Sequence, residues 1–306
     1  MVDKKAKKYV INQSNNQYFV GNNTSEITNW RYYMPAKYNI TNEEIQEFYR
    51  LRVQKKMSYT AIGKKFNISA QTVQRRLEDF IKDSKVNLSI NYNYDKYYFY
   101  DINTPEKAYW LGFITADGYV NQDKSFFHFH LGQKDVEHLE KFKQAISAID
   151  IPIKQTIHAI TGKCIVSFTV NGKEFINGLN KHGITNRKSM HEEPSSFVPI
   201  EFYRDYIRGL WDGDGYISKK RIGFCSSYNM CAWVQKQLML NCAVPYTKIG
   251  FDSNIYRLTI TKGKNNVLKW LYYSNSKSIS LYRKYKDAKI SILHEVNQKQ
   301  KALLPF

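Results

Sequence analysis

Two nine-residue stretches decide the fold of this chain: WLGFITADG at Trp110–Gly118 and IRGLWDGDG at Ile207–Gly215. Each is a short apolar run in which two small residues stand four positions apart. The small residues are Gly112, Ala116, Gly209 and Gly213. Residues four apart lie on one face of a helix, and a face without bulk lets two helix backbones come close together. The pattern therefore predicts two helices that pack tightly against each other.

Each stretch ends in an acid followed by a glycine, Asp117–Gly118 and Asp214–Gly215. A glycine just past the last turn is typical of a helix end. Each carboxylate then lies at the negative end of a helix dipole, where an anion is unfavourable. Two such acids on touching helices would also repel each other, and a divalent cation between them would remove both penalties. We therefore predict a metal site here; the alternative is a pair of acids that only cap helix ends.

The order of predicted elements after each stretch is the same in both halves of the chain. The stretches begin at residues 110 and 207, which is 97 positions apart. Lys188 follows Asp117 by 71 residues and Lys284 follows Asp214 by 70, with an arginine before each lysine. This spacing predicts an α+β fold made of two tandem αββαββα units in one pseudo-twofold monomer. Such symmetry suits a long, near-palindromic DNA duplex.

Both stretches resemble the LAGLIDADG motif of homing endonucleases, in a chain that carries the motif twice. The resemblance covers about Thr104 to Glu295. It implies that the two motif helices form the interface between similar subdomains, and that the strands form a saddle-like DNA-binding sheet. It also implies that Asp117 and Asp214 are the catalytic ligands of Mg²⁺, with Mn²⁺ as a substitute, and that the protein makes a site-specific double-strand break in DNA. The sixth motif position holds Thr115 in the first copy and Asp212 in the second; that acid is not the family's metal ligand, so we expect little consequence.

The resemblance implies further catalytic residues near each acid. Gln133 is the candidate polar residue of the first repeat, and Ser227 is its expected equivalent in the second, a departure that would make the two strand cuts unequal. Lys188 and Lys284 are the candidates for the family's basic residue. A lysine or glutamine at such a place can order the attacking water or neutralise developing charge. The alternative for both lysines is a solvated position at a helix start.

The composition favours a polyanionic partner. The chain has 306 residues, with 46 lysines and arginines against 27 acids and a net charge of +19. A surplus of that size indicates nucleic acid before a membrane surface. The four cysteines form no CxxC pair, which argues against zinc and for a reducing compartment. No apolar run reaches membrane-spanning length. We expect a cytoplasmic protein from a bacterial or phage gene on a mobile element, with an organellar origin left open.

Three short helices are predicted before the first repeat. Thr41 and Glu44 form a capping box, the second helix covers Tyr59–Phe66, and Ser69 caps a third helix over Ala70–Lys82. The expected buried positions are Ile45, Phe48 and Val53 in the first helix and Val73, Leu77 and Phe80 in the third. Asn67 stands where the turn needs a left-handed backbone.

This arrangement resembles a helix-turn-helix of the kind found in resolvases and many regulators. The third helix would then enter the major groove of DNA. The residues expected on DNA are Gln71, Thr72, Gln74 and Arg75, with Arg76 on phosphates. The alternative is a plain three-helix domain with a solvated basic face.

The strands after each motif helix supply further candidates for DNA contacts. Over Ser125–Gly132, Phe127, Phe129 and Leu131 alternate with His128 and His130, so one face is core and the other is polar. An HxH pair can bind a metal, but no third ligand is in view, so we interpret both histidines as surface or DNA-facing residues. In the second half, Arg221 and Arg257 are the candidates for guanine contacts.

Composition and spacing divide the chain into six expected segments. They are a basic arm without regular structure at 1–38, a helix-turn-helix at 39–83, a linker at 84–103, repeats at 104–199 and 200–296, and a tail at 297–306. The linker contains the aromatic run Tyr97–Tyr100, for which packing is expected before stacking on bases.

Two other functions compete with the endonuclease. One is a DNA-binding transcription regulator that keeps the fold and has lost cleavage; the presence of both Asp117 and Asp214 argues against it. The other is an RNA maturase that helps an intron to splice, which the sequence leaves open.

Overall fold

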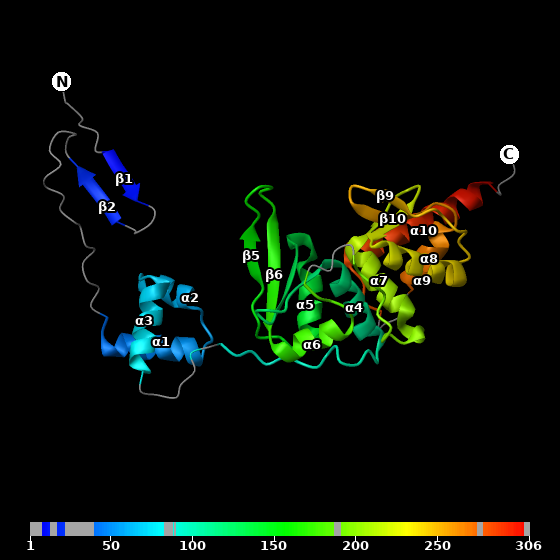
Figure 1. Ribbon diagram of the computed structural model, residues 1–306. Helices are drawn as coiled ribbons and strands as arrows, with labels where there is room; N and C mark the ends of the chain where they lie inside the picture. Colours follow the sequence, from blue (N-terminus) through cyan, green and yellow to red (C-terminus); the bar gives the residue numbers. More distant parts are fainter. Residues whose placement is uncertain are drawn as a thin grey trace, which may run out of the picture. The chain divides into compact units, whose positions relative to one another are not determined.

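The computed structural model describes residues 8–12, 17–21, 40–82, 88, 90–186, 191–273 and 278–302. The chain divides into two compact units, residues 1–91 and 92–306 (Figure 1). None of the helices in these described ranges combines the length and the apolar character that crossing a membrane requires.

Two short strands lie in the N-terminal segment, β1 (Lys8–Asn12) and β2 (Gln17–Gly21). They pair antiparallel, with Lys8 opposite Gly21. The structure differs here from the arm without regular structure that the sequence predicted for residues 1–38. Both segments, KYVIN and QYFVG, are rich in β-branched and aromatic residues, which favour strands.

Three helices follow in the first unit: α1 (Asn42–Val53), α2 (Tyr59–Phe66) and α3 (Ala70–Phe80). The predicted capping box of Thr41 and Glu44 is present, and the Ser69 side chain accepts the backbone N–H of Thr72. The predicted bounds of α2 are confirmed, and α3 ends two residues earlier than expected. The local capping signals of the sequence therefore placed these helices.

The three helices enclose a small core of their own. Its buried residues are Phe48, Leu51, Ile62, Val73, Leu77 and Leu88. Val53 and Phe80 are 39% and 47% exposed, so the prediction that they are buried is wrong. Each is the last residue of its helix, where the chain turns away from the core.

The turn between α2 and α3 depends on two residues. Asn67 has the predicted left-handed backbone, with φ of 54°. A Cβ on Gly63 would lie 2.6 Å from the carbonyl oxygen of Ile68, so only glycine lets the chain turn this closely. This turn brings the start of α3 against α2.

The second unit is built from two copies of one α+β motif. The first copy contains α4 (Pro105–Asp117), β3 (Gly118–Asn121), β4 (Phe126–Gly132), η1 (Gln133–Asp135), α5 (Val136–Ala145), β5 (Lys154–Ile157), β6 (Cys164–Asn171) and α6 (Lys173–Lys181). The second contains η2 (Ile200–Phe202), α7 (Tyr203–Asp214), β7 (Gly215–Ile217), β8 (Ile222–Ser226), α8 (Tyr228–Cys242), β9 (Gly250–Asp252), β10 (Ile255–Ile260), α9 (Lys264–Leu271) and α10 (Tyr282–Ala302).

The two sheets have the same topology. Their strand orders are β3-β4-β6-β5 and β7-β8-β10-β9, and every pairing is antiparallel. Gly118 faces Phe129 in the first sheet, and Gly215 faces Phe224 in the second. The predicted tandem αββαββα repeat and the α+β fold class are confirmed.

The motif helices α4 and α7 pack against each other through their small residues. A Cβ on Gly112 would lie 3.0 Å from Leu210 N, and one on Gly209 would lie 2.7 Å from Phe113 N. Gly213 lies against the Ala116 methyl group in the same way. The predicted close approach of the two helices is therefore confirmed, and it forms the seam between the two repeats.

The positions of three elements of this unit were not predicted from the sequence. Strands β5 and β9 are four and three residues long, and every residue in them is exposed. They therefore carry no alternation of apolar and polar residues that would mark a buried face. Helix α10 is 21 residues long and extends across residue 297, where the tail was expected to start. Between 282 and 295 only Lys284 and Ala288 are buried, and Tyr285 and Ile292 pack partly buried against the core. This apolar stripe is too weak to recognise in the sequence.

Residues 92–103 belong to the second unit rather than to a linker. Tyr98, Phe99 and Ile102 are buried in its core, and the Phe99 carbonyl oxygen lies 2.8 Å from His182 Nε2. The packing interpretation of the aromatic run is confirmed for Tyr98 and Phe99, whereas Tyr97 is exposed.

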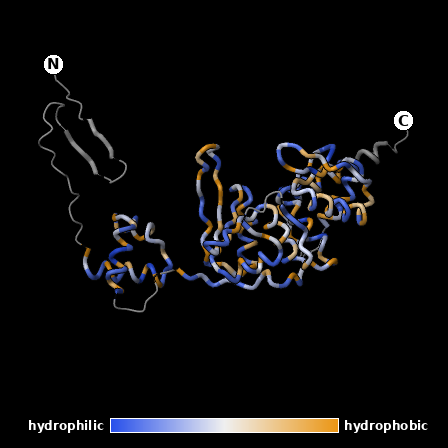
Figure 2. Tube along the Cα trace, in the orientation of Figure 1, coloured by the Kyte–Doolittle hydropathy of each residue, from blue (hydrophilic) through white to orange (hydrophobic). Residues whose placement is uncertain are grey.

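The β5–β6 hairpin carries hydrophobic residues at its exposed tip (Figure 2). Ile157 and Ile160 are 74% and 90% exposed. These isoleucines add nothing to the core, which lies between the sheets and the motif helices.

Candidate metal and DNA site

Local sequence places both motif acids at the end of a helix. In α4, Thr104 is the N-cap and Pro105 the first helical residue, as predicted, and the helix ends at Asp117. Helix α7 ends in the same way at Asp214. The next residue in each case starts a strand, so both acids stand where a motif helix passes into its sheet.

The glycine after each acid is required for a different reason than a left-handed turn. Gly118 and Gly215 have φ of −78° and −86°, which any residue can adopt. A Cβ on Gly118 would lie 2.7 Å from the Ile114 carbonyl oxygen, and one on Gly215 would lie 2.8 Å from Trp211 Cγ. The glycines therefore end the helices as predicted. Each strand begins so close to the last helical turn that there is no room for a Cβ at this position.

The structure brings the two acids together. A Cβ on Gly213 would lie 3.3 Å from Asp117 Oδ2, so the Asp117 carboxylate lies against α7, one residue before Asp214. Asp117 is half-buried and Asp214 is exposed. Two carboxylates from two helix C-termini thus share one region of negative potential.

Lys284 lies close enough to both acids to interact with their charges. Its side chain is buried, and Nζ donates a hydrogen bond to the Gly215 carbonyl oxygen. Burial lowers the pKa of Lys284, while the charges of Asp212, Asp117 and Asp214 oppose that shift. The alternative of a solvated lysine is therefore wrong for Lys284. Lys188, the predicted counterpart, lies outside the described residues.

Asp212 is a residue whose importance the sequence underestimated. It is fully buried and accepts three hydrogen bonds, from Tyr109 Oη at 2.8 Å, Tyr272 Oη at 2.7 Å and Leu281 N at 2.6 Å. Burial raises the pKa of Asp212, and the Leu281 amide opposes this shift most strongly. Thr115, at the same place in the first motif, donates its hydroxyl to Leu111 O instead. The difference at the sixth motif position therefore separates the two repeats structurally.

The expected equivalence of Gln133 and Ser227 is wrong. Counting from the paired residues Phe129 and Phe224, Gly132 corresponds to Ser227 and Gln133 to Tyr228. Ser227 is buried, caps α8 and donates its hydroxyl to Glu192 O at 2.5 Å. Gln133 is exposed at the start of η1.

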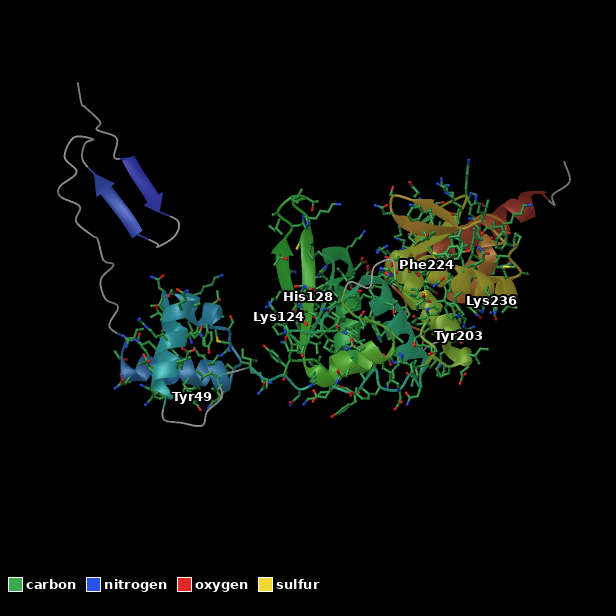
Figure 3. All side chains as sticks on the ribbon, in the orientation of Figure 1. Tyr49, Lys124, His128, Tyr203, Phe224 and Lys236 are labelled. Carbon is green, nitrogen blue, oxygen red and sulfur yellow. The ribbon has the colours of Figure 1, made fainter. Side chains whose placement is uncertain are left out.

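The two predicted DNA-facing histidines lie on the polar face of the first sheet. Phe127, Phe129 and Leu131 are buried as predicted. His128 is half-buried and lies 2.7 Å from the Thr169 hydroxyl, whereas His130 is exposed; Figure 3 shows His128 on the first sheet.

The two arginines of the second sheet differ in exposure. Arg221 is exposed in the turn before β8. Arg257 is half-buried and faces Cys225 across the β8–β10 pair. Arg221 is therefore accessible to a ligand from solvent, whereas Arg257 lies partly buried on the sheet.

Helix α3 presents only part of its predicted set to solvent. Gln71, Gln74 and Arg75 are exposed, although Gln74 Nε2 donates to Glu78 at 2.8 Å. The Thr72 hydroxyl lies 2.8 Å from Ser69 Oγ, and Arg76 is half-buried.

The donor set at the two acids fits a hard divalent cation. Within the described ranges, His, Cys, Asp and Glu side chains form no cluster of three or more that could hold a metal ion. Mg²⁺ commonly takes only one or two carboxylates and completes its shell with water and substrate phosphates. Asp117 and Asp214 meet that requirement, and a soft-metal site is not favoured.

The sequence of the second repeat matches a known family. The profile of the LAGLIDADG-like domain matches residues 201–286, which include α7, Asp212, Asp214 and Lys284. Residues 201–286 are therefore similar to a LAGLIDADG-like domain. The first repeat has the same sheet order around its own LAGLIDADG-like stretch.

Solved structures similar to this chain include DUF199/WhiA and homing endonucleases. Full-length DUF199/WhiA from Thermatoga maritima is 13% identical, with 70% of this chain and 72% of that chain covered and a TM-score of 0.42. The homing endonuclease I-WcaI bound to its DNA recognition sequence is 12% identical, with 69% and 92% covered and a TM-score of 0.42. I-DmoI in complex with DNA and Mn is 17% identical, with 55% and 96% covered and a TM-score of 0.37. None of the curated proteins matches this chain.

Proposed function

We propose that this protein is a site-specific DNA endonuclease that depends on a divalent cation and breaks both strands. The observation that carries the proposal is the meeting of Asp117 and Asp214 at the ends of two helices in contact, with the buried Lys284 attracted by both. A buried cation beside two acids at one surface is expensive to maintain, so the arrangement favours a chemical role.

Each residue of the site has a distinct proposed role. Asp117 and Asp214 would hold Mg²⁺, or Mn²⁺ in its place, and this metal would supply an activated water and positive charge at a phosphate. Lys284 places a positive charge where the phosphate gains negative charge. Gln133 and Lys188 keep the predicted roles of ordering water and neutralising charge in the first repeat.

Duplex DNA is the proposed partner, bound by a monomer. The net charge of +19 supports phosphate contacts, and the repeated sheet order supports a long, near-palindromic target. His128, His130, Arg221 and Arg257 are proposed to read base edges from the sheets. The three helices α1–α3 are proposed to act as a helix-turn-helix, with exposed Gln71 and Arg75 in the major groove.

One observation favours a second function, a DNA-binding regulator that does not cleave. The Lys284 ammonium group already supplies positive charge to both acids. A carboxylate pair satisfied in this way can exist without a metal. Cleavage must therefore be measured directly.

The deciding experiment is a cleavage selection on randomised duplexes with Mg²⁺ or with EDTA. We expect cut duplexes only with Mg²⁺, and loss of double-strand cutting in Asp117→Asn and Asp214→Asn while DNA binding persists. Asp287→Asn is the matched control, because Asp287 is exposed on α10 and its substitution removes the same charge. Sequence-specific binding without cutting in Mg²⁺ or Mn²⁺ would establish the regulator instead.

A further inference from the structure

The two motif helices differ at two buried positions, and the difference has a structural purpose. Arg208 and Asp212 of α7 are 1% and 0% exposed. Their counterparts 97 positions earlier are Leu111 and Thr115. Burying two ionised side chains is costly unless they are fully hydrogen-bonded. Their partners therefore indicate what these residues do.

Arg208 donates hydrogen bonds to backbone carbonyl groups of the chain that precedes α10. Its Nε donates to Ile279 O at 2.7 Å and its Nη1 donates to Leu271 O at 3.2 Å. Its Nη2 donates to Asp205 at 2.6 Å, which neutralises the guanidinium charge within α7. One face of α7 thus fixes the end of α9 and the segment that leads into α10.

Asp212 holds the same segment by an amide group. Leu281 N donates to Asp212 Oδ2 at 2.6 Å, and Tyr272 Oη donates to Oδ1 at 2.7 Å. Leu281 is the residue directly before α10, and Lys284 is the third residue of that helix. The two α7 side chains therefore fix the segment before α10 by hydrogen bonds, an interaction that we call the ionic grip. Arg208 bonds the carbonyl group of residue 279, and Asp212 bonds the amide group of residue 281.

Lys284 is the functional side chain that this grip places. Because it stands within the first turn of α10, its direction follows directly from where the helix begins. Its Nζ reaches Gly215 O, one residue after Asp214. Leu111 has no polar group, and the Thr115 hydroxyl bonds within α4, so these two side chains do not form the ionic grip of α7.

We propose that Asp212, together with Arg208, is a positioning residue that sets Lys284 at the two carboxylates. The inference rests on the proposed endonuclease function, because its consequence is a rate of strand cleavage. Asp212 acts through Lys284, so the two residues must affect the same strand and must not act independently.

The test is a double-mutant cycle on the full chain with a duplex labelled differently on each strand. Lys284→Met is expected to slow one strand selectively, and Asp212→Ala is expected to slow that same strand by about 10- to 100-fold. The double variant is expected to be no slower than Lys284→Met alone. Thr115→Ala, at the matched position of the first motif, removes a hydroxyl that contacts Leu111 O and Tyr206. It is expected to leave both strand rates within about twofold, since neither contact involves the residues that hold the start of α10.

Two further measurements keep the outcome unambiguous. Asp212→Asn keeps an oxygen acceptor for the Leu281 amide, and it is expected to restore part of the rate lost in Asp212→Ala. Hydrogen exchange at residues 280–285 is expected to be faster in Asp212→Ala than in the parent protein. If Asp212→Ala does not fold, Asp212→Asn serves as the second arm of the cycle.

The possible results separate the inference from the proposed function. Equal slowing of both strands, or losses that add in the double variant, would overturn the positioning role while cleavage itself stands. If the parent protein cuts no duplex, the endonuclease proposal fails, and hydrogen exchange decides whether Asp212 holds the start of α10. Whether or not the protein cuts DNA, unchanged hydrogen exchange at residues 280–285 in Asp212→Ala would overturn the claim that Asp212 holds the start of α10.

Discussion

The seam between α4 and α7 allows a direct test of why its glycines are needed. Gly209 lies where α7 crosses α4, and a Cβ there would lie 2.7 Å from Phe113 N and 3.0 Å from the Tyr109 carbonyl carbon. Ordinary van der Waals contact begins at 3.4 Å. Gly209→Ala therefore requires the two helices to move apart, because the obstructing atoms belong to the backbone and cannot rotate away.

The expected cost follows from two opposing effects. Alanine stabilises a helix interior relative to glycine by about 1 kcal/mol. Overpacking typically costs about 1–3 kcal/mol and sometimes more, and the separation also lengthens the 2.8 Å hydrogen bond from Tyr109 to Asp212. Because the clash is with rigid backbone, we expect an overpacking cost in the upper part of the range of about 1–3 kcal/mol, which exceeds the gain in helix propensity. The predicted net loss in the free energy of unfolding is about 2 kcal/mol.

The assay is urea unfolding followed by tryptophan fluorescence, since Trp110 and Trp211 lie on the two helices. Gly132→Ala is the matched control, because a Cβ there has its nearest neighbour, Lys134 Cγ, at 3.9 Å. The control is expected to be neutral or to stabilise by about 0.5 kcal/mol. If Gly209→Ala were as stable as the control, close backbone contact would not be the reason for glycine at this seam.

Three other predictions concern pH, helix capping and salt. Burial lowers the pKa of His138 from 6.5 to about 3, and its Nε2 lies 2.9 Å from Tyr109 Oη. As the pH falls below 6.5, His138 therefore takes up a proton in the unfolded state and not in the folded state. The free energy of unfolding should then fall by about 1.4 kcal/mol per pH unit. His138→Gln should flatten that slope in urea titrations between pH 7 and 5, and identical slopes would contradict the argument. Ser69→Ala should destabilise α3 by about 1 kcal/mol, measured by thermal unfolding, with exposed Ser253→Ala as a neutral control. DNA affinity should fall steeply as salt is added, because phosphate contacts release counterions; a flat dependence in fluorescence anisotropy would argue against duplex binding.

Much of the fold was predictable because it depends on local chemistry. Thr41, Ser69 and Thr104 cap helices through contacts within three residues. The alternation of Phe127 and Phe129 with His128 reports a strand with one buried face. The misses included Val53 and Phe80, which are the last residues of their helices, and the short exposed strands β5 and β9, which carry no apolar pattern.

The candidate site was predictable only in part. Asp117 and Asp214 could be placed together because each ends a helix whose small residues require close packing. The wrong equivalence of Ser227 and Gln133 arose because a polar residue after a strand can either cap the next helix or face a ligand. Only the strand register and the hydrogen bonds of Ser227 separate these two roles.

By itself, the sequence determined that two helices with glycine faces pair, and that two acids stand at their ends, because spacing along a helix is fixed by its geometry. Only the tertiary structure decided that Lys284 reaches those acids and that Asp212 holds the start of its helix. Asp212 and Leu281 are 69 residues apart, and contacts over such separations depend on how whole elements pack. A buried carboxylate and a solvated one have the same letter in the sequence, and packing alone tells them apart.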